Sequence, residues 1–126
     1  MAKREWSEVK ICTAPRCQYE FGKDDDPHLV KMFCITRRAG MPKLAFWGGV
    51  LCENCLGQVK EIASRCRHDF SAGGQIGQLF IDELDIRKDP FANFCNSCFS
   101  RFLPKLGKFL WPWNDFVTML RFFDQG

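Results

Sequence analysis

Apolar residues between positions 52 and 66 recur three and four residues apart, which is the spacing of one face of an α-helix. Polar residues such as Glu53, Lys60 and Arg65 fill the positions between them. The pattern predicts an amphipathic helix over about residues 53–66, which Gly57 weakens slightly because glycine is a poor helix former.

Two strand-like segments precede this helix. Residues 29–36 and 44–51 are rich in β-branched, aromatic and other apolar side chains. Gly40 and Pro42 lie between them and are typical of a turn. We therefore expect a β-hairpin that leads directly into the helix.

The second half of the chain is patterned less clearly. Residues 75–87 fit either a pair of strands or a short helix. Helical turns after Cys98 should kink or end at Pro104, since proline clashes with the carbonyl four residues earlier. Asn114 suits the N-cap of a last helix, one that is rich in Phe.

The small residues at positions 71–74 mark a boundary between two parts of the chain. We expect one module over residues 1–70 and a second, with an aromatic helical tail, over residues 71–126, unless the two form one compact domain. The predicted fold class is a small α+β protein in which bound zinc stabilises both parts.

Cysteine content brings in the candidate chemistry. Eight cysteines occur among 126 residues, and the N-terminal residues contain no apolar run typical of a secretory signal. We expect a cytoplasmic protein, or a nuclear one if the source is eukaryotic, and not a secreted one. Thiols stay reduced in those compartments, which favours structural zinc over disulfides.

The spacing of the cysteines predicts two zinc ions. Cys52 and Cys55 form one C-x-x-C pair, and Cys95 and Cys98 form another in a similar apolar frame. Two such pairs in one short chain are a strong zinc signal, because two residues between ligands let both reach one ion. Cys12 and Cys17 form a wider third pair.

The order of these features over roughly residues 9–66 resembles the treble-clef group of zinc fingers. In that group a knuckle supplies two ligands, a β-hairpin follows, and the first turn of a helix supplies two more. The resemblance implies a first zinc site whose four ligands are Cys12, Cys17, Cys52 and Cys55.

Helix geometry keeps Cys66 out of that first site. Eleven helical residues rise roughly 16 Å, whereas two sulfurs on one zinc lie about 4 Å apart. We therefore assign Cys66, His68, Cys95 and Cys98 to the second site. Cys34 in place of His68 is the alternative, and an interleaved cross-brace as in RING-type domains is a rival arrangement.

Metal binding also changes the charge. The formal net charge is +3, but a four-cysteine zinc site adds about −2 and a three-cysteine, one-histidine site adds about −1. The zinc-loaded chain is thus near neutral, which removes the apparent affinity for nucleic acid. The sequence also lacks the H-E-x-x-H and deaminase patterns of catalytic zinc.

The functional prediction is a non-enzymatic zinc-binding module, acting as adaptor, regulator or inhibitor on another protein. Candidate partner-binding residues lie at the hairpin turn and in the aromatic tail, through which two copies could also associate: Arg37, Arg38, Lys43, Trp111 and Trp113. The alternative is a nucleic-acid-binding zinc finger that uses Arg37, Arg38, Lys43, Arg65 and Arg67.

Overall fold

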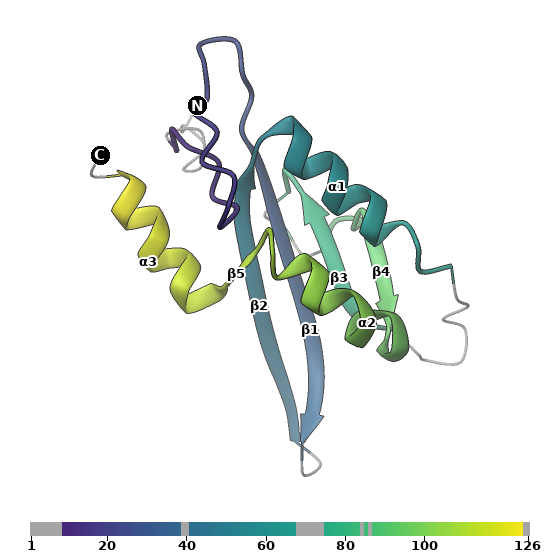
Figure 1. Cartoon of the computed structure of the whole chain (residues 1–126). Coiled ribbons are helices and arrows are strands. Elements are labelled where there is room, and N and C mark those ends of the chain that lie inside the picture. Colours follow the sequence, from purple (N-terminus) through teal and green to yellow (C-terminus); the bar gives the residue numbers. More distant parts are fainter. Residues whose placement is uncertain (1–8, 39–40, 68–74, 84, 86, 125–126) are drawn as a thin grey trace.

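The protein is an α+β fold built on one antiparallel sheet (Figure 1). The computed structural model describes residues 9–38, 41–67, 75–83, 85 and 87–124. The elements follow one another as β1 (His28–Arg38), β2 (Met41–Leu51), α1 (Glu53–Ala63), β3 (Gln75–Ile81), β4 (Ala92–Cys95), α2 (Asn96–Leu106), β5 (Trp111–Pro112) and α3 (Trp113–Asp124). The strand order in the sheet is β4-β3-β1-β2-β5.

The predicted hairpin is present and is longer than the sequence pattern indicated. Its register runs from the pair His28 and Leu51 to the pair Arg38 and Met41. Alternate residues of β1 point to opposite faces, as the pleat of a strand requires. Figure 1 shows the far end of the β1–β2 hairpin projecting beyond the rest of the sheet.

Helices cover the two faces of this sheet unequally. On one face α1 and α2 pack over Val30, Met32 and Cys34, all fully buried, to form the main core. On the other face α3 covers only the part near Leu29 and Val50. The ring of Phe116 lies against Gly48, where an added Cβ would meet ring carbons at 3.1 Å.

Residues 75–87, which we expected to form either a pair of strands or a short helix, contain one strand in their described part, β3. Residues 75–81 pair with β1 as β3, and the chain returns through an irregular segment to β4. The prediction missed β4 because this strand is short and directly precedes the Cys95–Cys98 helix start.

Two helix boundaries differ from the sequence expectation: α2 does not end at Pro104, one of the two outcomes predicted there, and α3 begins before Asn114. Helix α2 continues through Pro104 and ends at Leu106, because the buried residues Phe99, Phe102 and Leu106 hold its apolar face in the core. Helix α3 begins at Trp113, so Asn114 lies inside the helix and does not cap it. Pairing of Trp111–Pro112 with β2 as β5 fixes the chain just ahead of this earlier start.

The sheet takes strands from both predicted modules, with β1 and β2 from residues 1–70 and the other three from residues 71–126. The main core likewise includes buried residues from both parts, for example Met32 and Phe94.

Within the described residues, none of the helices is both long enough and apolar enough to cross a membrane.

Two glycine substitutions should change stability in opposite directions. A Cβ at Gly57 would meet nothing within 4 Å, so Gly57→Ala should stabilise α1 by about 0.5–1 kcal/mol. A Cβ at Gly49 would lie 3.1 Å from the Phe109 carbonyl oxygen and 3.2 Å from Thr13 Oγ1. Gly49→Ala should therefore destabilise the fold by about 1–3 kcal/mol. Chemical denaturation of the metal-loaded protein measures both, and equal effects would contradict the packing described.

Candidate metal centres

Four thiols from distant parts of the sequence meet at the start of α1. The sulfur atoms of Cys12, Cys17, Cys52 and Cys55 all lie within 4.8 Å of one another. The Cys17 and Cys52 sulfurs are 3.7 Å apart, close to the roughly 3.8 Å expected between two sulfurs bound tetrahedrally to one zinc. Three of the four residues are buried and Cys17 is half-buried. The group has the number, type and spacing of ligands that a metal ion requires.

A short loop positions the first two thiols. The Cys12 amide donates to the Tyr19 carbonyl oxygen at 2.7 Å, and the Cys17 amide donates to the Ala14 carbonyl oxygen at 3.0 Å. These bonds close a tight turn, in which Gln18 has a positive φ of 56°. The turn brings Cys12 and Cys17 side by side on the face toward α1.

Thr13 connects this loop to the end of β2. Its hydroxyl donates to the Val50 carbonyl oxygen at 3.2 Å and accepts from the Val50 amide at 2.7 Å. The Trp111 indole N–H donates to the Thr13 carbonyl oxygen at 2.6 Å. Two residues after Val50 the chain reaches Cys52, whose amide donates to Cys12 Sγ at 3.4 Å. Register within the sheet thus decides where the first four thiols meet.

The electrostatics of this group also favour a cation. Burial raises the pKa of the Cys12 thiol to about 11 and raises the pKa of Cys55 as well. Burial also opposes ionisation of Cys17, but the Tyr19 amide and the neighbouring thiols outweigh it and lower the Cys17 pKa. Several adjacent thiolates repel one another unless a positive ion lies among them. A divalent metal ion bound among them would therefore favour loss of the thiol protons of Cys12 and Cys55, whose pKa values are raised by burial.

A second group of three thiols lies where the ends of α1 and α2 approach each other. The sulfur atoms of Cys66, Cys95 and Cys98 all lie within 4.8 Å of one another, and the Cys66 and Cys95 sulfurs are 3.9 Å apart. Cys95 is the N-cap of α2, and its sulfur accepts from the Cys98 amide at 3.4 Å. This hydrogen bond from the Cys98 amide is the main reason that the pKa of Cys95 is lowered. Burial raises the pKa of Cys98 to about 12.

Helix α1 ends three residues earlier than predicted, and this early end serves the second group. Ser64 caps the helix through its amide, and its hydroxyl donates to the Glu61 carbonyl oxygen at 2.9 Å. The chain then leaves the helix axis, which brings Cys66 to Cys95. The two groups are sequential along the chain, not interleaved as in a cross-brace.

The fourth ligand predicted for the second group, His68, lies outside the described residues. The alternative, Cys34, is fully buried in the main core and belongs to neither thiol group. Burial raises the pKa of Cys34, as expected of a thiol in an apolar environment.

The predicted partner-binding residues lie at two separate places. Arg37, Arg38 and Lys43 lie at the far end of the β1–β2 hairpin, and their side chains fall outside the described part of the chain. Trp111 is half-buried and donates its indole N–H within the protein, while Trp113 is 37% exposed.

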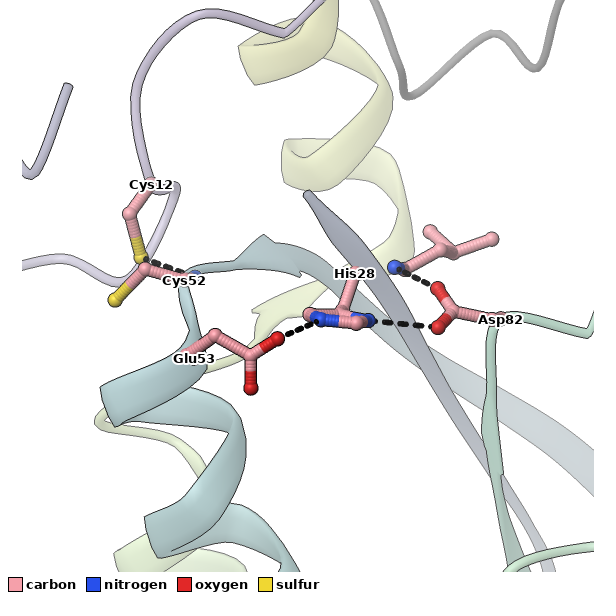
Figure 2. A network of polar contacts seen from close by, with 6 residues as sticks. Cys12, His28, Cys52, Glu53 and Asp82 are labelled. Atoms are coloured by element: carbon pink, nitrogen blue, oxygen red, sulfur yellow. Dashed lines mark hydrogen bonds and ion pairs between the residues drawn. The ribbon is translucent and has the colours of Figure 1, made fainter. Parts of the chain in front are cut away.

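Beside the first thiol group, an imidazole lies between two carboxylates (Figure 2). His28 Nδ1 is 2.7 Å from Asp82 Oδ2, and His28 Nε2 is 2.6 Å from Glu53 Oε1. Asp82 also accepts from the Leu29 amide at 2.9 Å and has a positive φ of 56°. This network joins the start of β1, the end of β3 and the first residue of α1.

The role of His28 in this network is not visible in the sequence. His28 is the first residue of β1, with both ring nitrogens bound by carboxylates. Its partners lie 25 and 54 residues away in the chain, so no local pattern could identify them. The only sequence signal was the presence of acidic residues just after two apolar segments.

No family model, curated protein or solved structure matches this chain. The geometry of the two thiol groups and of the surface around them is therefore the basis on which a function can be inferred.

Metal content should follow the two thiol groups. Cys55→Ser should lose one of two bound metal ions and unfold the first half, because binding at such sites contributes about 10 kcal/mol or more, comparable to the whole stability of a small domain. Cys98→Ser should lose the other ion. Native mass spectrometry counts the ions, and circular dichroism follows the fold.

Cys34→Ala is the matched control, since this cysteine is buried but outside both groups. It should keep both ions and lose only about 1 kcal/mol through the small cavity. Loss of an ion from Cys34→Ala, or a wild-type chain that binds none, would contradict this assignment.

The His28 network should make stability depend on pH. Burial lowers the pKa of His28, but the hydrogen bonds from the ring to Asp82 and Glu53 outweigh it, so the net pKa is raised. A raised pKa means that the stabilisation is complete below the unfolded value of about 6.5 and is lost as pH rises through the folded value. His28→Gln should cost about 1 kcal/mol at the acidic end, with Glu53 contributing least because it is exposed.

Denaturation of the metal-loaded wild type and His28→Gln between pH 6 and 9 measures this difference. Arg65→Gln, which removes an exposed ion pair with Glu61, is the control and should show no trend with pH. The difference in unfolding free energy between wild type and His28→Gln should shrink as pH rises, and a difference that grows with pH would contradict the raised pKa of His28.

Proposed function

We propose that both thiol groups bind zinc and that the zinc is structural. The first group and the elements around it resemble a treble-clef finger, with Cys12 and Cys17 in the place of the knuckle, the β1–β2 hairpin after them, and Cys52 and Cys55 at the start of a helix. Four thiolates at this spacing favour zinc over harder ions such as magnesium or calcium, which prefer oxygen ligands. His68 completes the second site in this proposal.

The complete set of four protein ligands in the first group is the observation that supports a structural role for the metal. It supplies four protein ligands, and three of them are almost inaccessible to solvent: Cys12, Cys52 and Cys55 are 2%, 6% and 4% exposed. A catalytic zinc keeps one coordination position for water or substrate. A fully ligated, buried ion has no such position, which supports a stabilising role.

The protein is then a non-enzymatic interaction module that binds another protein, expected in a reducing compartment such as the cytosol. Its zinc sites hold the loop, the hairpin and the helices together and leave the projecting hairpin open to a partner. The apolar side chains of Ile35, Leu44 and Trp113 are exposed on this hairpin and beside it, and side chains of this kind contribute strongly to protein interfaces.

Nucleic acid is the less favoured partner. Of the basic residues that would serve it, Arg65 pairs with Glu61 at 3.1 Å, which reduces its charge toward phosphate. The zinc-loaded chain is near neutral, so it lacks the long-range positive field that attracts nucleic acid.

Two measurements test this function. Elemental analysis of the purified protein should give two zinc ions per chain, and titration with duplex DNA and single-stranded RNA at low salt should give no saturable binding. Binding that falls steeply with rising salt would support the nucleic-acid alternative instead.

Purification from native cells tests the protein partner directly. The chain should elute from a sizing column well above its own 14.6 kDa, together with a second polypeptide, before and after nuclease treatment. Elution as a free monomer, or loss of the complex on nuclease treatment, would contradict the proposal.

A further inference from the structure

On the sheet face that α3 partly covers, one end of the β1–β2 hairpin carries apolar side chains that no described helix or loop covers. We define the hairpin strip as Phe33, Ile35, Leu44, Phe46 and Trp113. Ile35 and Leu44 are cross-strand partners on β1 and β2 and are 43% and 55% exposed, and Trp113 is 37% exposed. Phe33 and Phe46, the next pair along, are half-buried.

The strip is continuous and not a scatter of single exposed residues. The Phe33 ring lies 6.0 Å from that of Phe46, and the Phe46 ring lies 5.9 Å from that of Trp113. Phe33 also stacks on the buried Phe80 at 5.9 Å, with ring planes 10° apart. These contacts hold the rings in place, so a partner would meet a preformed surface.

Helix α3 covers the neighbouring part of the same face, and only its first residue, Trp113, belongs to the strip. Its buried residues Phe116 and Met119 pack with Val9, Leu29 and Val50, at the opposite end of the hairpin from Ile35 and Leu44. Trp113, at the start of α3, is where the covered and uncovered parts meet. Beyond it, no described helix or loop buries Ile35 or Leu44.

Charge indicates what covers the strip. The hairpin strands β1 and β2 include four basic residues and no Asp or Glu: Lys31, Arg37, Arg38 and Lys43. Among the described side chains, the Lys31 ammonium lies 6.0 Å from the Phe46 ring centre and 5.9 Å from that of Trp113. Positive charge and apolar surface thus occur together on this hairpin.

We propose, building on the interaction function above, that the hairpin strip binds an extended acidic segment of a partner protein whose alternate residues are large and apolar. An extended segment presents alternate side chains to one side, so its apolar residues contact Ile35, Leu44 and the aromatic rings. Its acidic residues alternate with these and point away from the strip, so they act through the longer-range attraction of the basic hairpin, which steers association.

Two other occupants fit less well. A second copy of this chain docked face to face would bring two hairpins of like charge together, which opposes association. Single-stranded nucleic acid binds by stacking bases on open aromatic faces. The two most exposed residues of the strip are aliphatic, and the rings of Phe33 and Phe46 already contact other rings.

Fluorescence anisotropy with a short labelled peptide, in which Leu and Phe alternate with Asp and Glu, tests the proposal on the zinc-loaded full chain. The wild type should bind this peptide. It should bind neither a charge-reversed version with Lys in place of the acids nor an acidic version with Ser in place of Leu and Phe.

Ile35→Ser and Leu44→Ser should each weaken binding by about tenfold, the effect of losing one well-packed interface side chain. Phe91→Ser is the matched control, because Phe91 is 46% exposed but lies outside the strip. It should leave the affinity unchanged. Zinc content and the unfolding midpoint of each variant check that the fold is intact.

The outcomes separate this proposal from the broader one. Peptide binding that Leu44→Ser and Phe91→Ser weaken equally would overturn the hairpin strip while leaving a protein-binding module. Binding of an oligouridylate but not of the peptide would overturn both. If no probe binds, the strip proposal fails, and the native-complex experiment alone decides the broader function.

Discussion

The close approach of the Cys12, Cys17, Cys52 and Cys55 sulfurs is the constraint on which the amino-terminal part of the protein depends. Four thiols within 4.8 Å of one another cannot all ionise without a cation, and burial raises the pKa of Cys12 and Cys55. A metal ion changes this repulsion into attraction because each thiolate then faces two positive charges. Metal binding at this group would therefore be coupled to folding.

The same constraint determines how the surrounding elements are joined. Thr13 attaches the loop that supplies Cys12 and Cys17 to the end of β2 through paired hydrogen bonds with Val50. The carboxylate network around His28 adds a second attachment at the start of α1, one residue after Cys52. Together these bonds fix the end of the hairpin near the metal site and leave the other end free to project.

This division gives the two ends of the hairpin different physical character. At the metal end, α3 and the main core bury both faces of the sheet. At the far end one face keeps exposed aliphatic residues beside ordered aromatic rings. Rigidity at one end lowers the entropy cost of presenting an apolar surface at the other, which is the physical basis of the proposed interaction function.

Local sequence patterns determined the elements whose signals are contained within a few residues. The three-and-four spacing after Cys52 specified α1, and the two β-rich segments specified the hairpin. The C-x-x-C spacing specified that the two thiols of each pair would lie close together. The treble-clef resemblance indicated that Cys12 and Cys17 would join Cys52 and Cys55, and the structure brings these four together.

Only the tertiary structure decided the features that depend on contacts between distant residues. Burial of Phe102 and Leu106 carries α2 past Pro104, pairing of β5 with β2 precedes the early start of α3, and two distant carboxylates bind His28. In each case a free energy from long-range packing or hydrogen bonding outweighs a local preference of similar or smaller size. The sequence pattern also could not predict which part of the hairpin α3 leaves uncovered, because strand register and the position of the helix determine it together.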